Sequence, residues 1–175
     1  MISELELDRA FANKVASSPE FLVWVIRQTK FHEQAENFVL LAKEQAESKP
    51  RKRPENWWRH WWCRLDDGTE SETDIFVVLG LPNSDQRVAL HIEDKPPHGK
   101  FTPDQYINYR KRAIFMANKQ QYMNYSVFTT ILLAPRAFIE EHNSQAEHFD
   151  TSILYEEVAK FIPLFEKSLC EAQDV

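Results

Sequence analysis

The chain has 175 residues, a formal net charge of −6 and an apolar content of 43%, which is typical of one soluble globular domain. Its three glycines lie far apart. That spacing excludes glycine-rich phosphate-binding loops and the elbow of serine hydrolases, because these motifs need clustered glycines. Cys63 and Cys170 cannot form a disulfide framework, so we expect a reduced, cytoplasmic compartment. No apolar stretch approaches the roughly 18–20 residues that span a bilayer, so we expect no membrane association.

Helices are expected before the first strand. Ser18, Pro19 and Glu20 form a typical helix start, with an N-cap, a first-turn proline and an acid that the helix dipole favours. They open an apolar helix that ends near Arg27. A second helix is predicted from Phe31 to Glu47, because its apolar residues recur at helical spacing. The segment Lys49–Pro54 carries four basic residues and two prolines, and it is predicted to be a loop.

Strands dominate the middle of the chain. The apolar and aromatic runs, stopped by glycine, proline or Asp-Gly signals, predict four strands, with a helix before the last of them. Short links among the first three strands predict antiparallel pairing, and the intervening helix predicts a right-handed parallel crossover to the fourth. We therefore predict a single α/β domain over residues 1–175, with a mixed central sheet flanked by helices. In chain order the elements expected after the basic loop are strands 57–65, 74–79 and 87–95, a helix 103–119, a strand 126–133, a short helix at 135 and a final helix 152–162.

Charged residues lie at the ends of two of these apolar strands. Because strand side chains alternate, Glu93 and Lys95 share one face of their strand. Asp74 begins the preceding strand, and hairpin-type pairing brings its carboxylate beside Glu93. Two carboxylates with a lysine alongside form a hard-oxygen pocket that suits Mg²⁺ or Mn²⁺. Such a pocket is suited to phosphodiester hydrolysis, in which Lys95 positions the attacking water.

This pattern resembles the signature of the PD-(D/E)XK nuclease superfamily, whose members have the restriction-endonuclease-like fold. Asp74 is followed nineteen residues later by Glu93-Asp94-Lys95. The next helix carries Gln105 and Tyr109, which resemble a Q-x3-Y motif of many members. The predicted order of elements also matches the family's α-β-β-β-α-β core. The resemblance covers residues 31–133, with helical additions at both ends.

The resemblance implies a role for each residue. Asp74 and Glu93 would bind Mg²⁺ or Mn²⁺, Lys95 would align the attacking water, and Gln105 and Tyr109 would support the site or contact the scissile strand. Family members often add an acidic residue from the first core helix. Glu36 borders the apolar face of the helix predicted over 31–47, so we expect it to be that third metal ligand.

The expected partner is nucleic acid, with DNA preferred over RNA. Arg112, Lys52 and Arg53 are the candidate backbone contacts, because basic side chains neutralise phosphates. The net charge of −6 argues against a protein that coats nucleic acid along its length. It is compatible with a local basic groove. A small nuclease domain would have to form a homodimer to cut both strands of a duplex together.

Alternatives stay open from the sequence alone. Asp74, Glu93 and Lys95 can form a structural ion-pair cluster, and the chain can be an inactive, nuclease-like binding module for nucleic acid or a partner protein. The aromatic segment containing Trp57, Trp58, Trp61 and Trp62 can stack on bases, but core packing is the favoured interpretation. His91 is expected to be a buried, hydrogen-bonded histidine.

Overall fold

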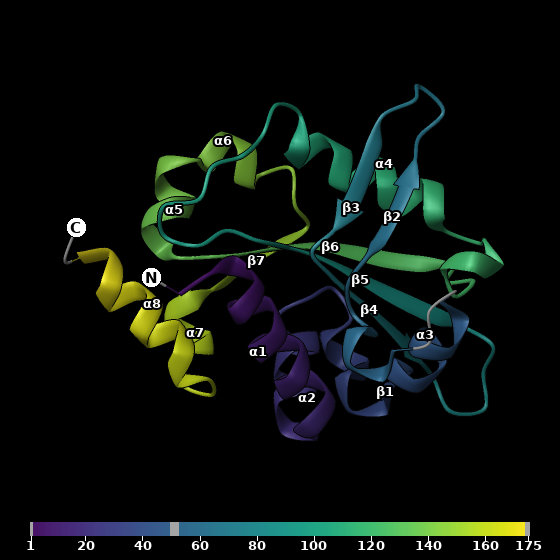
Figure 1. Cartoon of the computed structure of the whole chain (residues 1–175). Coiled ribbons are helices and arrows are strands. Elements are labelled where there is room, and N and C mark those ends of the chain that lie inside the picture. Colours follow the sequence, from purple (N-terminus) through teal and green to yellow (C-terminus); the bar gives the residue numbers. More distant parts are fainter. Residues whose placement is uncertain (1, 50–52, 174–175) are drawn as a thin grey trace.

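The structure is a computed structural model that describes residues 2–49 and 53–173. It is a mixed α/β structure in which a five-stranded sheet, of order β1-β4-β5-β6-β7, is flanked by helices on both faces (Figure 1). A second sheet contains only β2 and β3. The predicted mixed sheet between helices is confirmed. The strands are β1 Val39–Leu40, β2 Trp61–Arg64, β3 Glu70–Thr73, β4 Ile75–Gly80, β5 Arg87–Asp94, β6 Val127–Ala134 and β7 Thr151–Leu154.

The pairing of the central strands follows the predicted topology. β4 and β5 are antiparallel, and β5 and β6 are parallel with α4 as the crossover between them. The helix predicted over 152–162 is wrong in its first part, because Thr151–Leu154 pairs in parallel with β6 and extends the sheet. Ile153 is fully buried there, so tertiary packing outweighs the local helix-start signal.

Helices cover the two faces of the sheet unequally (Figure 1). One face carries α1, α2, α3, α7 and α8, and the other carries α4, α5, α6 and the β2–β3 hairpin. The helices are α1 Glu4–Ser17, α2 Pro19–Arg27, α3 Ala42–Ser48, α4 Gln105–Met116, α5 Arg136–Glu141, α6 Asn143–Ala146, α7 Tyr155–Val158 and α8 Pro163–Gln173, with 3₁₀ turns η1 His32–Asn37, η2 Pro54–Asn56 and η3 Gln120–Tyr122.

The N-terminal third differs most from the prediction. α2 begins as expected, with the Ser18 hydroxyl accepting a hydrogen bond from Phe21 N at 3.2 Å. The long helix predicted over 31–47 is wrong, because the segment contains η1, the edge strand β1 and α3. Val39 pairs there with Gly80 of β4. α1, which was not predicted, is closed by a capping box between Ser3 and Glu6.

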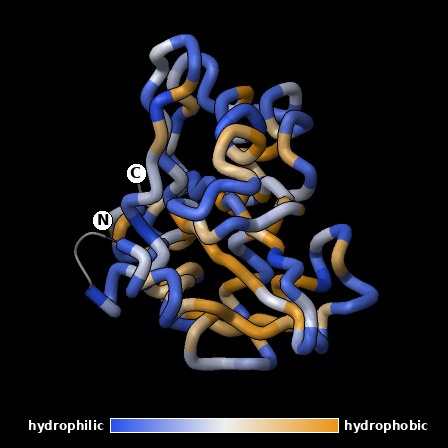
Figure 2. Tube along the Cα trace, turned by 90° about the vertical axis from the view of Figure 1, so that its right-hand side faces the viewer, coloured by the Kyte–Doolittle hydropathy of each residue, from blue (hydrophilic) through white to orange (hydrophobic). Residues whose placement is uncertain are grey.

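The core has one layer on each face of the sheet. Figure 2 shows hydrophobic segments toward the middle of the molecule and hydrophilic ones around its rim. Odd-numbered residues of β4, such as Val77, pack against α1 and α2, and even-numbered ones, such as Phe76, pack against the hairpin. His91 lies on the hairpin side, where its ring nitrogens are 3.0 Å from the hydroxyls of Thr73 and Tyr125. It is therefore buried and hydrogen-bonded, as predicted.

The β2–β3 hairpin projects from the body of the molecule (Figure 1). Its first strand begins at Trp61 rather than at Trp57 and pairs with β3, so the strand predicted over 57–65 does not join the central sheet. The turn contains Gly68 with a φ of +84°, a left-handed conformation that favours glycine. Of the four tryptophans in residues 57–62, three are buried, whereas Trp62 is 56% exposed. Core packing is thus confirmed for three of them.

Across the described ranges, no helix is both long enough and apolar enough to cross a bilayer.

Candidate active site

Asp74 and Glu93 lie opposite each other on neighbouring strands. The register pairs Ile75 with Ile92, so the next pair outward is Asp74 with Glu93. Opposite residues of an antiparallel pair have Cβ atoms about 4.5–5.5 Å apart. Asp74 occupies the single position between the end of β3 and the start of β4. Its Oδ2 accepts a hydrogen bond from Asp94 N at 3.0 Å, which holds the carboxylate against β5.

Lys95 and Gln105 converge on the Glu93 carboxylate. The Lys95 ammonium contacts Glu93 Oε1, and Gln105 Nε2 donates a hydrogen bond to the same oxygen at 2.6 Å. Glu93 Oε2 is buried and has no hydrogen-bond partner among the described residues. Burial and the neighbouring Asp74 raise the pKa of Glu93 well above its usual value, and Lys95 opposes that shift. The structure thus brings Asp74, Glu93, Lys95 and Gln105 together.

Tyr109 joins the two strands that carry the carboxylates. Its hydroxyl accepts a hydrogen bond from Asp74 N at 3.1 Å and donates one to Ile92 O at 3.2 Å. Gln105 and Tyr109 are one helical turn apart, so both reach the sheet from one face of α4. Burial, then Asp74 and Glu93, raise the pKa of Tyr109 well above its usual value. Tyr109 therefore stays a neutral hydrogen-bonding group that fixes the backbone under the site.

Arg112 extends this row of side chains but points away from solvent. It is 1% exposed, and its Nε donates to Thr73 Oγ1 at 2.8 Å. The centre of its guanidinium lies 4.0 Å from the centroid of the Tyr109 ring. Sequence reasoning expected Arg112 to contact a nucleic-acid backbone. In this conformation it instead clamps α4 to the end of β3 and does not reach a phosphate at the surface.

The remaining predicted site residues are not brought to this cluster. Glu36 lies in η1, where its side chain is 73% exposed and 2.5 Å from Arg27. It precedes β1, which pairs with the Gly80 end of β4, about 20 Å along the strand from Asp74 at 3.3 Å per residue. Arg53 is exposed just before η2. Lys52 lies outside the described residues.

Glu4 of α1 is an acidic residue near this cluster that sequence reasoning did not identify. Glu4 is half-buried, and its pKa is raised by burial and by the charge of Asp74, while Lys95 opposes the shift. Glu4 therefore lies close enough to both residues to feel their charges. Glu4 and Asp8 are one turn apart on a helix that buries Leu7 and Phe11. That spacing of acids at the border of an apolar face was the signal in the sequence.

Behind the strand, Asp94 faces the opposite way from Glu93. Its carboxylate accepts a hydrogen bond from the Tyr155 hydroxyl and also meets Asp8 of α1. Burial, with the charges of Asp94 and Asp74, raises the pKa of Asp8 to about 11. Burial also raises the pKa of Asp94 to about 8. This pair therefore retains a proton at neutral pH and attaches α1 to β5, one turn from Glu4.

Within the described ranges, no group of three or more histidine, cysteine, aspartate or glutamate side chains is arranged to hold a metal ion. Comparison with protein-family models, curated proteins and solved structures found no match to this chain. The geometry of Asp74, Glu93, Lys95 and the residues that support them is the basis for assigning a function.

Proposed function

We propose that the protein is a metal-dependent nuclease that hydrolyses phosphodiester bonds of DNA. The observation that carries this proposal is the pairing of Asp74 opposite Glu93, with Lys95 contacting Glu93 from the same strand. The resemblance to the PD-(D/E)XK superfamily belongs to the same proposal. The order β4, β5, α4, β6, with antiparallel then parallel pairing, supports a restriction-endonuclease-like core.

The donor set fits a hard divalent cation. Mg²⁺ is commonly held by only one or two carboxylates together with water and substrate phosphate, so a cluster of three acids is not required. Glu93 Oε2 is buried without a partner among the described residues, so this oxygen is free to bind a cation. Burial raises the pKa of Glu93, and the nearby Asp74 charge adds to that shift. Asp74 and Glu93 would hold Mg²⁺ or Mn²⁺, with Glu4 adding negative charge beside them.

Each side chain has a defined task in such a reaction. When bound, the metal polarises the phosphate and lowers the pKa of water. Lys95 places a cation where negative charge develops, in a site that excludes solvent and so strengthens the interaction. Gln105 fixes the orientation of Glu93, and Tyr109 fixes the backbone at Asp74. These groups are preorganised by β4, β5 and α4 rather than by flexible loops.

A metal titration tests the proposal directly. Millimolar Mg²⁺ or Mn²⁺ is expected to raise the melting temperature by a few degrees, because binding relieves carboxylate repulsion in the folded state. The same ions should support cleavage of labelled single-stranded or duplex DNA, whereas Ca²⁺ should bind without turnover. Asp74→Ala should lose the thermal shift and the cleavage together. Unchanged melting across millimolar Mg²⁺ and Mn²⁺ would contradict a metal site.

Glu4 and Glu36 provide a matched comparison. Glu4→Gln is expected to weaken Mg²⁺ affinity by about 10-fold, the usual lower scale for a supporting carboxylate, because it removes negative charge beside Asp74. Glu36→Gln should leave the affinity unchanged, since its carboxylate pairs with Arg27. Isothermal titration of Mg²⁺ into both variants measures the difference. If Glu36→Gln loses Mg²⁺ affinity and Glu4→Gln does not, the supporting carboxylate is Glu36 and not Glu4.

An inactive, nuclease-like binding module is the second candidate. It is favoured by the closed contact between Lys95 and Glu93, in which Lys95 is only 5% exposed and Glu93 is fully buried. Such a contact can serve structure alone. DNA binding without metal-dependent cleavage, together with a melting temperature that ignores Mg²⁺, would favour this module over the nuclease.

A further inference from the structure

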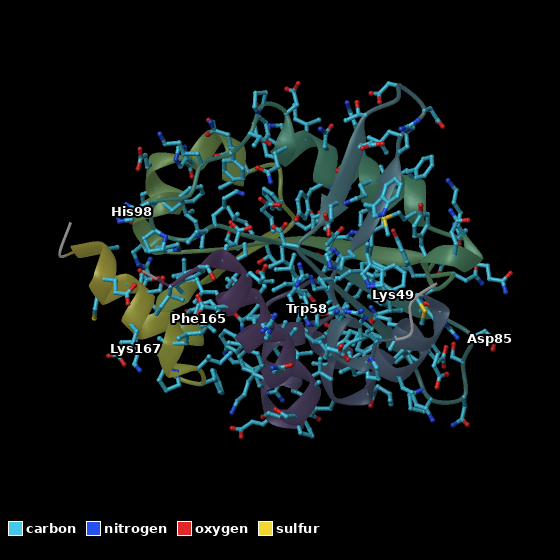
Figure 3. The ribbon with its side chains drawn as sticks, in the orientation of Figure 1. Lys49, Trp58, Asp85, His98, Phe165 and Lys167 are labelled. Carbon is cyan, nitrogen blue, oxygen red and sulfur yellow. The ribbon has the colours of Figure 1, made fainter. Side chains whose placement is uncertain are left out.

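A cavity of about 240 Å³ lies beside the candidate active site. Its walls are the first turn of α1, the loop that follows β5, and α8. In Figure 1 the start of α1 approaches α8, and Figure 3 places His98, at the rim, just above that helix. The lining of the cavity includes Ile2, Glu4, Pro96, Pro97, Ser168, Glu171 and Ala172.

Glu4 connects this cavity to the site. The same side chain lines the cavity and feels the charges of Asp74 and Lys95. On the opposite wall, Pro96 directly follows Lys95 in the chain. A phosphodiester bound at the candidate site would therefore have its nearest sugar and base toward the cavity, which Glu4 and Pro96 border.

The lining suits a flat, uncharged group that carries N–H donors. Two proline rings, Ile2 and Ala172 supply apolar walls. Glu4 supplies a carboxylate, which repels phosphate but accepts hydrogen bonds from amino or imino groups. Ser168 also lines the cavity, and its side-chain hydroxyl can donate or accept a hydrogen bond.

We propose that this cavity binds the base of the nucleotide adjoining the cleaved phosphodiester, so that the substrate strand is unpaired there. The inference rests on the proposed nuclease function and specifies its substrate class as single-stranded DNA or an unpaired end. A base inside a duplex is stacked and paired, and it must leave the stack before it can enter a protein pocket. Apolar contact with its faces and hydrogen bonds to its edge then retain it.

A cavity-filling variant tests this inference. Ala172→Phe places a ring in the cavity, and Cys170→Phe adds the same ring at an exposed position of the same helix. Ala172→Phe is expected to weaken binding of a fluorescent single-stranded oligonucleotide by about 10-fold, the scale for losing one base contact. Its rate on bis(p-nitrophenyl) phosphate, which has no base, should equal that of the wild type. Cys170→Phe should match the wild type in both assays.

A series of oligonucleotides, each with one abasic nucleotide, identifies the base. One position is expected to weaken binding to the wild type about 10-fold and to have no effect in Ala172→Phe, because the contact is already lost. If binding depends on that position but no cleavage occurs, the result supports the base pocket and refutes the nuclease function. The inference would be overturned by any of three results. These are cleavage with no sensitive position, equal binding by Ala172→Phe and the wild type, and no binding of single strands at all.

Discussion

Lys95→Ala is expected to reduce metal-dependent cleavage by a factor of about 10²–10⁴, the usual scale for one catalytic charge in a closed site. The ammonium contacts Glu93 in a pocket from which solvent is almost excluded. It therefore acts on charge that develops during the reaction more than on substrate binding. Affinity for DNA should stay close to that of the wild type. Cleavage rates and fluorescence anisotropy on one labelled oligonucleotide measure the two effects.

Lys100→Ala is the matched control, because Lys100 is an exposed lysine on the loop after β5. It should retain normal cleavage. Removing Lys95 also leaves Glu93 beside Asp74 without its cation, so a thermal melt must accompany the assay. We expect the fold to persist, because Glu93 takes up a proton when its pKa is raised. If Lys95→Ala unfolds while Asp74→Ala keeps Mg²⁺-dependent cutting, the cluster is a structural ion-pair network.

The central part of the candidate site could be predicted from local rules. Alternation along a strand places Glu93 and Lys95 on one face, and a short connection makes the neighbouring strands antiparallel. Those two facts are enough to bring Asp74 to Glu93. Helical spacing likewise brings Gln105 and Tyr109 to the same strands. Each step depends on a periodicity within one element or on a connection of few residues.

The errors came from packing between distant elements. Glu36 was assigned from a helical face, but that segment forms an edge strand with β4 because Val39 and Leu40 pair there. Glu4 reaches the site only because α1 packs across the sheet, far from Asp74 in the chain. Arg112 has the composition of a surface contact, yet hydrogen bonds to Thr73 and stacking on Tyr109 bury it. Of these contacts, the sequence signals only that of Glu4, through the spacing of Glu4 and Asp8 at the border of an apolar helix face.

The buried carboxyl pair behind β5 makes the stability of this protein depend on pH. Asp8 and Asp94 meet between α1 and the sheet, where burial raises the pKa of Asp8 to about 11 and that of Asp94 to about 8. Both values exceed the unfolded value of about 3.9. Folding therefore takes up protons above about pH 4. The contribution of this pair to the free energy of unfolding is largest below that pH. It falls as the pH rises toward the pKa values of the folded state.

Asp8→Asn is expected to make the protein more stable at pH 8, by about 2–4 kcal/mol. One extra bound proton lowers the free energy of unfolding by about 1.4 kcal/mol for each unit of rising pH. Asparagine removes this proton uptake, while its amide can still donate a hydrogen bond to Asp94. Urea unfolding at pH 5, 6, 7 and 8 should show a steep decline for the wild type and a shallower one for the variant.

Asp85→Asn serves as the reference, because Asp85 is exposed in a loop at the opposite end of the molecule from His98 (Figure 3). Its pH profile should follow that of the wild type, because Asp85 is exposed and is not part of the buried pair of Asp8 and Asp94. Both variants replace one aspartate by asparagine, so a difference between them reports the burial of Asp8 rather than the change of residue type. Parallel profiles for all three proteins would mean that Asp8 is ionised in the folded state, and that α1 is not attached to β5 through a shared proton.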